Sequence, residues 1–393
     1  MRNVLVVGQV AFSVAALIFG GILMRAFIRI QYTDVGFRTE GVLLAATNPG
    51  LARYSEERGM EFYRQLMDRL KGQPGVRSAA LASHIPFGMA GFQMTGVVIE
   101  GHEIPADQEN IGVMSSSISP GYFETMKMRI VRGRDFDSRD TASSQPVMII
   151  NENMAKSYWH GRDPLGSRVR IGSRSGTEAV VVGISADSKY QWVLENPLPY
   201  LYRPYTQHYV PRMTILTAAS QPGYDPSGLS EPVRTAVRSL DANLPVFDVR
   251  TFRTFYTDRA LAPGRILTGM IGGLGVLGIV LAMVGLYGAI SYAIGRRTRE
   301  IGIRMASGAD RAGVVRMVLR QGIGMGLAGI VIGVATSAAL TPGMSPFLGK
   351  GTGEDPVVYL GVPALLLIAI LVACWAPARR ASRIDPWIAL RYE

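Results

Sequence analysis

Metal, acid–base or phosphate chemistry in this sequence would depend on four histidines and one glycine-lysine stretch. The histidines (His84, His102, His160 and His208) lie far apart, and none has a second histidine or a carboxylate at metal-ligand spacing. The stretch "GMSPFLGKGT" comes nearest to a phosphate-binding loop, but it has one residue too many before Gly349, and Gly351 replaces the required Ser or Thr. We therefore expect no catalytic residue, no metal, no cofactor bound by this chain and no ATP hydrolysis by the chain alone.

A dense block of positive charge is the strongest local feature. Residues 295–322, "GRRTREIGIRMASGADRAGVVRMVLRQG", contain seven arginines between two apolar segments. The whole chain has 393 residues, a net charge of +11 and 48% hydrophobic residues. Basic chains bind nucleic acid, acidic lipid or acidic partners, and arginines beside apolar runs favour the membrane over nucleic acid. The one cysteine, Cys374, excludes a disulfide framework.

Four segments are long and apolar enough to cross a membrane, which takes about 20 residues. We expect the first to be an uncleaved anchor, because its apolar run is too long for a signal peptide and no small-x-small cleavage pattern follows it. Its polar Gln9 is expected to face a neighbouring helix. The four predicted spans are 1–24, 266–294, 323–340 and 357–376.

The distribution of arginines predicts the topology. The loop 295–322 and the tail 377–393 are rich in arginine, whereas the loop 341–356 contributes only Lys350. Because positive loops stay in the cytoplasm, both termini and the loop 295–322 are predicted to be cytoplasmic. Residues 25–265 and the loop 341–356 are then extracytoplasmic. Arg25 and Arg29 oppose this rule locally.

The region 25–265 is predicted to be an α+β domain, built as two subdomains. A helix is expected within 55–72, with Ser55 as N-cap, Gly72 at its end and an apolar stripe of Met60, Tyr63, Leu66, Met67 and Leu70. A second helix is expected within 230–240, with Ser230 as N-cap. Five short strands are expected within 96–104, 146–154, 167–172, 178–187 and 212–220.

The arginine-rich loop has the pattern of a short amphipathic helix, a break at 307–309 and a second helix that runs on into the third span, with Asp310 as its cap. Two interpretations remain open. An interfacial helix would place its arginines on lipid headgroups. A docking element would bind a cytoplasmic partner, and Glu300 favours this, because an acid gains nothing from anionic lipid.

Several motifs resemble one family. The segment "YAIGRRTREIGIRMASGADRAGVVRMVLRQG" and the ending "PARRASRIDPWIALRYE" resemble FtsX-like and MacB-like permeases, which are membrane subunits of ABC transporters. The segments "GYFETMKMRIVRGRDF", "VMIINENMAKSYWHGRDPLGSRVRIG" and "VVVGISAD" resemble the MacB-type periplasmic core domain. The fold that this implies agrees with our count of spans: four transmembrane helices, ordered one plus three, with a large extracytoplasmic α+β domain.

The resemblance implies that the arginine-rich loop is a coupling region that contacts an ATPase. Ser307 departs from the family's usual Leu, which would weaken packing in the ATPase groove or shift specificity. The positions that match the family's coupling helix are Arg299, Glu300, Ile301, Gly302, Arg304, Met305, Ala306, Gly308 and Ala309.

The resemblance also implies a function, partners and a location. The chain would be the permease subunit of an ABC transporter in the bacterial inner membrane, with its large domain in the periplasm. It would transmit ATP-driven motion for efflux or export, with ATP bound on a cytoplasmic ABC ATPase dimer. Other candidate partners are a second permease copy or paralogue, membrane lipid, a periplasmic adaptor and an outer-membrane channel. An FtsX-like regulator that activates a cell-wall hydrolase is the alternative, and the chain would be one whole permease unit or half of a two-unit permease.

Glycines recur at small-x-x-x-small spacing in the second and third spans, which lets helices approach closely. Two interpretations stand equally: contact between two permease subunits, or packing within one subunit. The glycines concerned are Gly269, Gly273, Gly285, Gly322, Gly326, Gly329 and Gly333.

Overall fold

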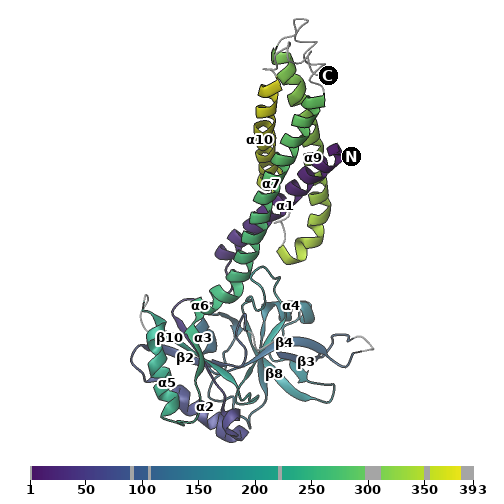
Figure 1. Ribbon diagram of the computed structural model, residues 1–393. Helices are drawn as coiled ribbons and strands as arrows, with labels where there is room; N and C mark the ends of the chain where they lie inside the picture. Colours follow the sequence, from purple (N-terminus) through teal and green to yellow (C-terminus); the bar gives the residue numbers. More distant parts are fainter. Residues whose placement is uncertain are drawn as a thin grey trace. The chain divides into compact units, whose positions relative to one another are not determined.

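The computed structural model describes residues 2–88, 93–104, 108–219, 224–296, 311–348 and 355–381. It divides into two compact units (Figure 1). One comprises residues 1–32 and 263–393, and the other runs from Thr33 to Ala262.

The first unit is a bundle of four long helices, so the expected one-plus-three order is confirmed. They are α1 (Arg2–Tyr32), α7 (Ala262–Arg296), α9 (Arg311–Leu348) and α10 (Pro356–Ala381). Three of them, α1, α9 and α10, contain a stretch that is long and apolar enough to cross a membrane: Val4–Ile30, Gly322–Gly343 and Pro356–Pro377. The fourth such stretch, Phe252–Tyr292, begins before α7 and includes most of it.

The helices of this unit are longer than the predicted spans. The first continues past residue 24 to Tyr32, since nothing that breaks a helix occurs before the turn at Gly36. Residues 341–348, expected in a loop, belong to α9 instead. There the Thr341 hydroxyl donates to the Ser337 carbonyl and hydrogen-bonds the Tyr359 hydroxyl of α10 at 2.9 Å, which ties the two helices together.

The second unit contains an eleven-stranded sheet with the order β11-β1-β10-β2-β4-β3-β7-β8-β6-β9, and β5 pairs with β8. The strands are β1 (Val42–Thr47), β2 (Val76–Ala82), β3 (Gln93–Ile99), β4 (Ile111–Ile118), β5 (Ile130–Gly133), β6 (Val147–Asn151), β7 (Arg168–Ile171), β8 (Thr177–Ser185), β9 (Tyr200–Pro204), β10 (Met213–Ala219) and β11 (Phe247–Thr251). The five predicted strands are present, but the one expected within 146–154 ends at Asn151, because Asn151 caps α4 (Glu152–Trp159). Of the other six, β1, β4 and β9 lack an alternating pattern because nearly all of their residues are buried.

One part of this unit has ferredoxin-like topology. Strands β11, β1, β10 and β2 pair antiparallel in that order. Helix α2 (Glu56–Lys71) connects β1 to β2, and α5 (Ser230–Arg238) connects β10 to β11. This is the β-α-β-β-α-β arrangement with a long insertion between its halves. Both helices contribute to one buried cluster with the sheet (Figure 1), which includes Tyr63, Leu66, Leu70, Val233 and Val237.

Helix α2 forms as predicted, whereas α5 begins differently. The Ser55 hydroxyl accepts from the Arg58 backbone N–H, and Gly72 is the C-cap. In α5 the residue expected as the cap, Ser230, is already inside the helix. A 3-10 turn, Pro226–Leu229, precedes it, and Asp225 caps that turn instead. The prediction was wrong because the local Asp-Pro signal lies one turn earlier.

The insertion between β2 and β10 closes into a ring. Strand β4 pairs with β3, β3 with β7, β7 with β8, β8 with β6, β6 with β9, and β9 with β4 again. All six strands supply side chains to a second buried cluster, together with α4 (Glu152–Trp159). The ring joins the ferredoxin-like part through one β2–β4 pair, Ala82 with Ile118.

Candidate functional site

The predicted coupling residues lie outside the described residues. Helix α7 ends at Arg296 before them, and α9 begins at Arg311 after them. The expected helix that runs on into the third span is confirmed, because α9 continues unbroken to Leu348. The expected amphipathic helix and the break at 307–309 fall outside the described part. Their role as a docking element therefore remains a proposal.

Five of the seven glycines singled out in the spans face other helices of the same bundle. A Cβ added to Gly329 would lie 2.7 Å from the Val10 Cβ, and one added to Gly333 would lie 2.6 Å from the Val14 Cβ. Gly322 and Gly326 face α10 at Cys374 and Ile370, and Gly285 faces α1. At these five positions, the absence of a side chain lets two helices of one chain approach closely.

The other two glycines differ. Apart from the adjoining residues and backbone of its own helix, no described heavy atom lies within 4 Å of a Cβ added to Gly269 or Gly273. Packing within one subunit therefore accounts for five of the seven glycines. Contact with another subunit stays possible at the other two, Gly269 and Gly273.

Two polar residues of the first helix have partners within the bundle. The Gln9 Oε1 would lie 2.7 Å from a Cβ on Gly285, so Gln9 faces a neighbouring helix as predicted. Arg25, which opposes the charge rule, forms an ion pair of 3.2 Å with Asp355. Asp355 also accepts from the Val357 backbone N–H at the start of α10. A paired Arg25 contributes little net charge to the topology.

Two histidines that are isolated in the sequence come together in the fold. The rings of His102 and His160 stack with centroids 5.8 Å apart, and Tyr158 meets His102 edge-on at 5.1 Å. Sequence spacing could not have shown this pair, because β3 and α4 are brought together only by the ring of strands. Within the described ranges, no group of three or more His, Cys, Asp or Glu side chains could hold a metal ion.

His208 and Ser117 also meet, but not in a reactive arrangement. The Ser117 Oγ lies 2.6 Å from the His208 Nδ1, and Ser117 is fully buried. Burial and the nearby positive charge of Arg203 lower the pKa of His208 to about 4. So weak a base, paired with a hydroxyl that no substrate reaches, does not make a nucleophile.

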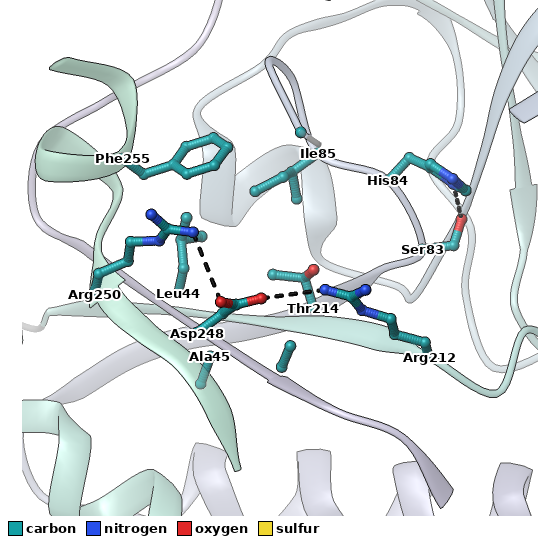
Figure 2. A pocket seen from close by; sticks show the side chains of 12 residues that line it. Leu44, Ala45, Ser83, His84, Ile85, Arg212, Thr214, Asp248, Arg250 and Phe255 are labelled. Atoms are coloured by element: carbon teal, nitrogen blue, oxygen red, sulfur yellow. Dashed lines mark hydrogen bonds and ion pairs between the residues drawn. The ribbon is translucent and has the colours of Figure 1, made fainter. Parts of the chain in front are cut away.

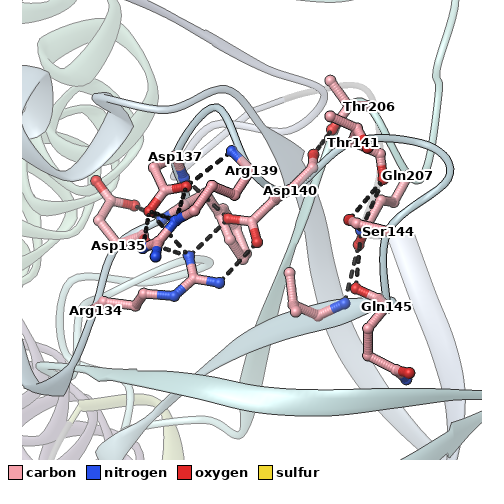
Figure 3. A network of polar contacts seen from close by, with 12 residues as sticks. Arg134, Asp135, Asp137, Arg139, Asp140, Thr141, Ser144, Gln145, Thr206 and Gln207 are labelled. Carbon is pink, nitrogen blue, oxygen red and sulfur yellow. Dashed lines mark hydrogen bonds and ion pairs between the residues drawn. The ribbon is translucent and has the colours of Figure 1, made fainter.

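Residues 132–136, "RGRDF", belong to a segment that resembles the MacB-type core domain. They take part in a polar network (Figure 3). Arg134 holds the carboxylate of Asp140 through both terminal nitrogens, at 2.7 and 2.8 Å. Burial alone would raise the pKa of Asp140, but hydrogen bonds from Arg134 and from the Asp137 backbone outweigh it, and the pKa is lowered. The Gln207 side chain stabilises the loop between β5 and β6. It accepts a hydrogen bond from the Val147 N–H and donates one to the Thr141 carbonyl. The network positions the β5–β6 connection.

The ferredoxin-like part also has a pocket that the sequence did not predict (Figure 2). Its lining comes from β1, β10, β11, α6 (Phe252–Tyr256) and the segment after β2. Residues from both halves of the ferredoxin-like part meet there only because β1 lies between β10 and β11. Its lining includes Leu44, His84, Ile85, Arg212, Thr214, Asp248, Arg250 and Phe255.

Two family models match the chain, one after the other along the sequence. The MacB-like periplasmic core domain matches residues 4–236, and the FtsX-like permease C-terminal matches residues 272–386. The first alone covers more than half of the chain. The chain belongs to the MacB/FtsX-like family of ABC transporter permeases.

Relatives that match this chain are named as permeases. It is 26% identical over 297 residues to the macrolide export ATP-binding/permease protein MacB of Burkholderia cenocepacia, with 72% of this chain and 41% of that protein covered. It is 26% identical over 301 residues to the ABC transporter permease YknZ of Bacillus subtilis, with 73% and 72% covered. The permease therefore spans less than half the length of the MacB relative.

Solved structures of similar domains also match this permease. The periplasmic region of MacB from Actinobacillus actinomycetemcomitans matches with 14% identity and a TM-score of 0.39, covering 58% of this chain and 97% of that one. The extracellular domain of YknZ from Gram-positive bacteria matches with 16% identity and a TM-score of 0.33, covering 52% and 100%.

Proposed function

We propose that this permease couples ATP hydrolysis on a partner ABC ATPase dimer to movement of its α/β unit, and that it does so for export. The observation that carries the proposal is the match of both family models, in order, on one chain. The name of the MacB relative, a macrolide export ATP-binding/permease protein, supports export as the purpose. The cargo of this permease is left open.

The path of the chain supports mechanical coupling. Helix α6 packs against β1 and β11, and a π-helical turn, Thr257–Leu261, joins it to α7 without a break. Helix α7 then leads to the predicted coupling residues. In this proposal, closure of the ATPase dimer pulls the coupling regions together, and α7 carries the movement to the sheet.

The proposed assembly has two permease subunits, as two copies or as a copy with a paralogue, surrounded by membrane lipid. Both termini and residues 295–322 would lie in the cytoplasm, and the α/β unit would lie outside. An adaptor and an outer-membrane channel are candidate further components. The name of the second family model, FtsX-like, keeps a regulatory role open, in which an outer cell-wall hydrolase would bind the α/β unit.

Substitution of Glu300 tests the coupling. The tagged permease is purified from native membranes in mild detergent, and co-purifying proteins are identified by mass spectrometry. Glu300→Arg should abolish permease-stimulated ATP hydrolysis of the co-purified ATPase without affecting membrane insertion. Glu109→Arg makes the same charge change at an exposed site of the α/β unit and should have no effect.

Two outcomes would count against parts of the proposal. Stimulation that survives Glu300→Arg would remove the coupling assignment, and failure to capture any ATPase after gentle cross-linking would remove the permease role. Capture of a cell-wall hydrolase on the α/β unit, in place of an adaptor, would replace export by regulation.

A further inference from the structure

The pocket of Figure 2 lies on the face of the ferredoxin-like sheet that its two helices leave uncovered. Leu43 belongs to the cluster beneath α2 and α5, so its neighbour Leu44, which lines the pocket, points to the opposite face. Helix α6 and the segment containing Ile85 cover that face in part and leave the pocket between them. The pocket thus has an apolar floor.

Two arginines in this pocket share a single acid. Asp248 lies between them, with its Oδ2 3.1 Å from an Arg212 nitrogen and its Oδ1 3.8 Å from an Arg250 nitrogen (Figure 2). No other acidic side chain of the described residues forms an ion pair with either arginine. One positive charge in the pocket is therefore left without a counter-charge.

The Arg250 guanidinium is held in place but makes no side-chain hydrogen bond to any described residue. Its distance of 3.8 Å from Asp248 exceeds a hydrogen bond. It lies over the Phe255 ring, 5.0 Å from the centroid, and only 33% of its side chain is exposed. A guanidinium that lies over an aromatic ring, and whose donors hydrogen-bond to none of the described residues, can bind a planar anion.

The backbone at Asp248 adopts an unusual conformation. Its φ is +52°, in the left-handed region that side chains other than Asn and Asp seldom adopt. The pairing of β1 with β11 shifts there, since Leu44 pairs with Arg250 and Ala46 with Phe247, which leaves two residues opposite Ala45. Such bulges redirect side chains and are frequent beside functional sites. Here the bulge coincides with the acid that partly neutralises the two arginines.

His84 adds a polar group to the pocket wall, and its neighbours extend the cavity. Burial lowers the pKa of His84, and the positive charge of Arg212 lowers it further. His84, Ile85 and Gly88 also line a second, smaller pocket with Tyr190, Tyr200 and Gln93. The Gln93 Oε1 there has no hydrogen-bond partner among the described residues.

We propose that this pocket binds an amphiphilic anion, whose carboxylate or phosphate contacts Arg250 and Arg212 while its apolar body lies on Leu44, Ile85 and Phe255. The anion would supply the missing counter-charge and the acceptors that Arg250 lacks. Because α6 forms one wall, an occupied pocket would contact the element that leads into α7.

The test uses the full chain in nanodiscs of phosphatidylcholine and isothermal titration calorimetry. The probes are octanoate, octyl phosphate and octyltrimethylammonium, each corrected for its binding to empty nanodiscs. We expect saturable binding of one or both anions and none of the cation. The two anions distinguish a carboxylate site from a phosphate site.

Variants at the charged residues sharpen the test. Arg250→Gln should weaken binding of the anion about tenfold, as for loss of a charge-assisted hydrogen bond. Asp248→Asn should strengthen it several-fold, because it removes the competing carboxylate and Asn tolerates the left-handed conformation. Arg170→Gln, at an exposed arginine paired with Glu178 on the ring, is the matched control and should change nothing.

Tighter binding by Asp248→Asn cannot come from misfolding, since a damaged domain cannot bind more tightly. Equal binding of the cation, or wild-type binding by both Arg250→Gln and Asp248→Asn, would overturn the proposal. The assay contains no ATPase, so its failure would leave the proposed coupling untouched. Loss of coupling in Glu300→Arg would likewise leave the pocket untouched.

Discussion

The carboxylate of Asp140 accepts two hydrogen bonds from the guanidinium of Arg134, at 2.7 and 2.8 Å, and only 4% of its side chain is exposed. Asp140 also accepts from the Asp137 backbone N–H, and its own carbonyl accepts from the Thr206 hydroxyl. One buried acid thus joins the β5–β6 loop to the segment that follows β9. We therefore assign the motif "RGRDF" a structural role, in which Arg134 stabilises the β5–β6 loop through Asp140.

Replacing this acid should destabilise the α/β unit. Asp140→Asn keeps the size of the side chain but removes its charge, so Arg134 loses the closer of its two ionic partners and keeps only Asp137, at 3.5 Å. We expect a loss of about 2–3 kcal/mol, seen as a lower thermal midpoint of the purified chain. Asp163→Asn is the control, because Asp163 pairs with Arg132 at the surface with 54% of its side chain exposed. Its loss should be below about 1 kcal/mol. Equal effects of the two changes would contradict the structural role of Asp140.

The depressed pKa of His208 predicts a pH dependence. The pKa of about 4 in the folded chain is below the usual value of 6.5, so the unfolded chain binds the proton more strongly. Stability should therefore be fully present above the unfolded pKa and should fall as the pH drops from about 6.5 towards about 4. His208→Asn keeps an acceptor for the Ser117 hydroxyl and cannot titrate.

The measurement is the difference in thermal midpoint between wild type and His208→Asn, taken at about pH 7 and about pH 5. Wild type should lose more stability than the variant over this range. Burial raises the pKa of Asp135 to about 6, and this acid acts in the opposite direction in both proteins, so it cancels in the comparison. Parallel losses in the two proteins would show that His208 does not titrate as its surroundings imply.

Elements that depend on residues close together in the sequence could be predicted. Arrangements that depend on contacts between distant strands could not. The four long helices and α2 follow from apolar length, spacing and the Ser55 cap. The ferredoxin-like sheet was not predicted, because its halves are separated by the whole ring of strands. The same separation concealed the site in which Arg212 and Arg250 meet. The stacking of His102 on His160 was missed for this reason as well, whereas the Ser230 cap was wrong because a stronger cap, Asp225, lies just before it.

The orientation of the chain in the membrane is testable by reporters. The excess of arginine in 295–322 and in the tail predicts that both face the cytoplasm. Alkaline phosphatase fused after Glu393 should therefore be inactive, and a fluorescent protein fused there should be bright. Phosphatase inserted near residue 225, beside the cap of the 3-10 turn, should be active. The reverse pattern at both sites would invert the proposed topology, including the side on which an ATPase could dock.

Two glycine substitutions should separate packing within one permease from contact between two. Gly333→Val would place its Cβ 2.6 Å from both the Val14 Cβ and the Ala11 carbonyl, so α1 and α9 must move apart and the thermal midpoint should fall. The Cβ of Gly269→Val would meet no described atom of another helix within 4 Å, so this change should leave the midpoint unchanged. If Gly269 lies against a second subunit, the same change should lower the dimer fraction measured by cross-linking in native membranes. A stable, fully dimeric Gly269→Val protein would place the subunit contact elsewhere, whereas a destabilised monomer would mean that this face of α7 packs within its own chain.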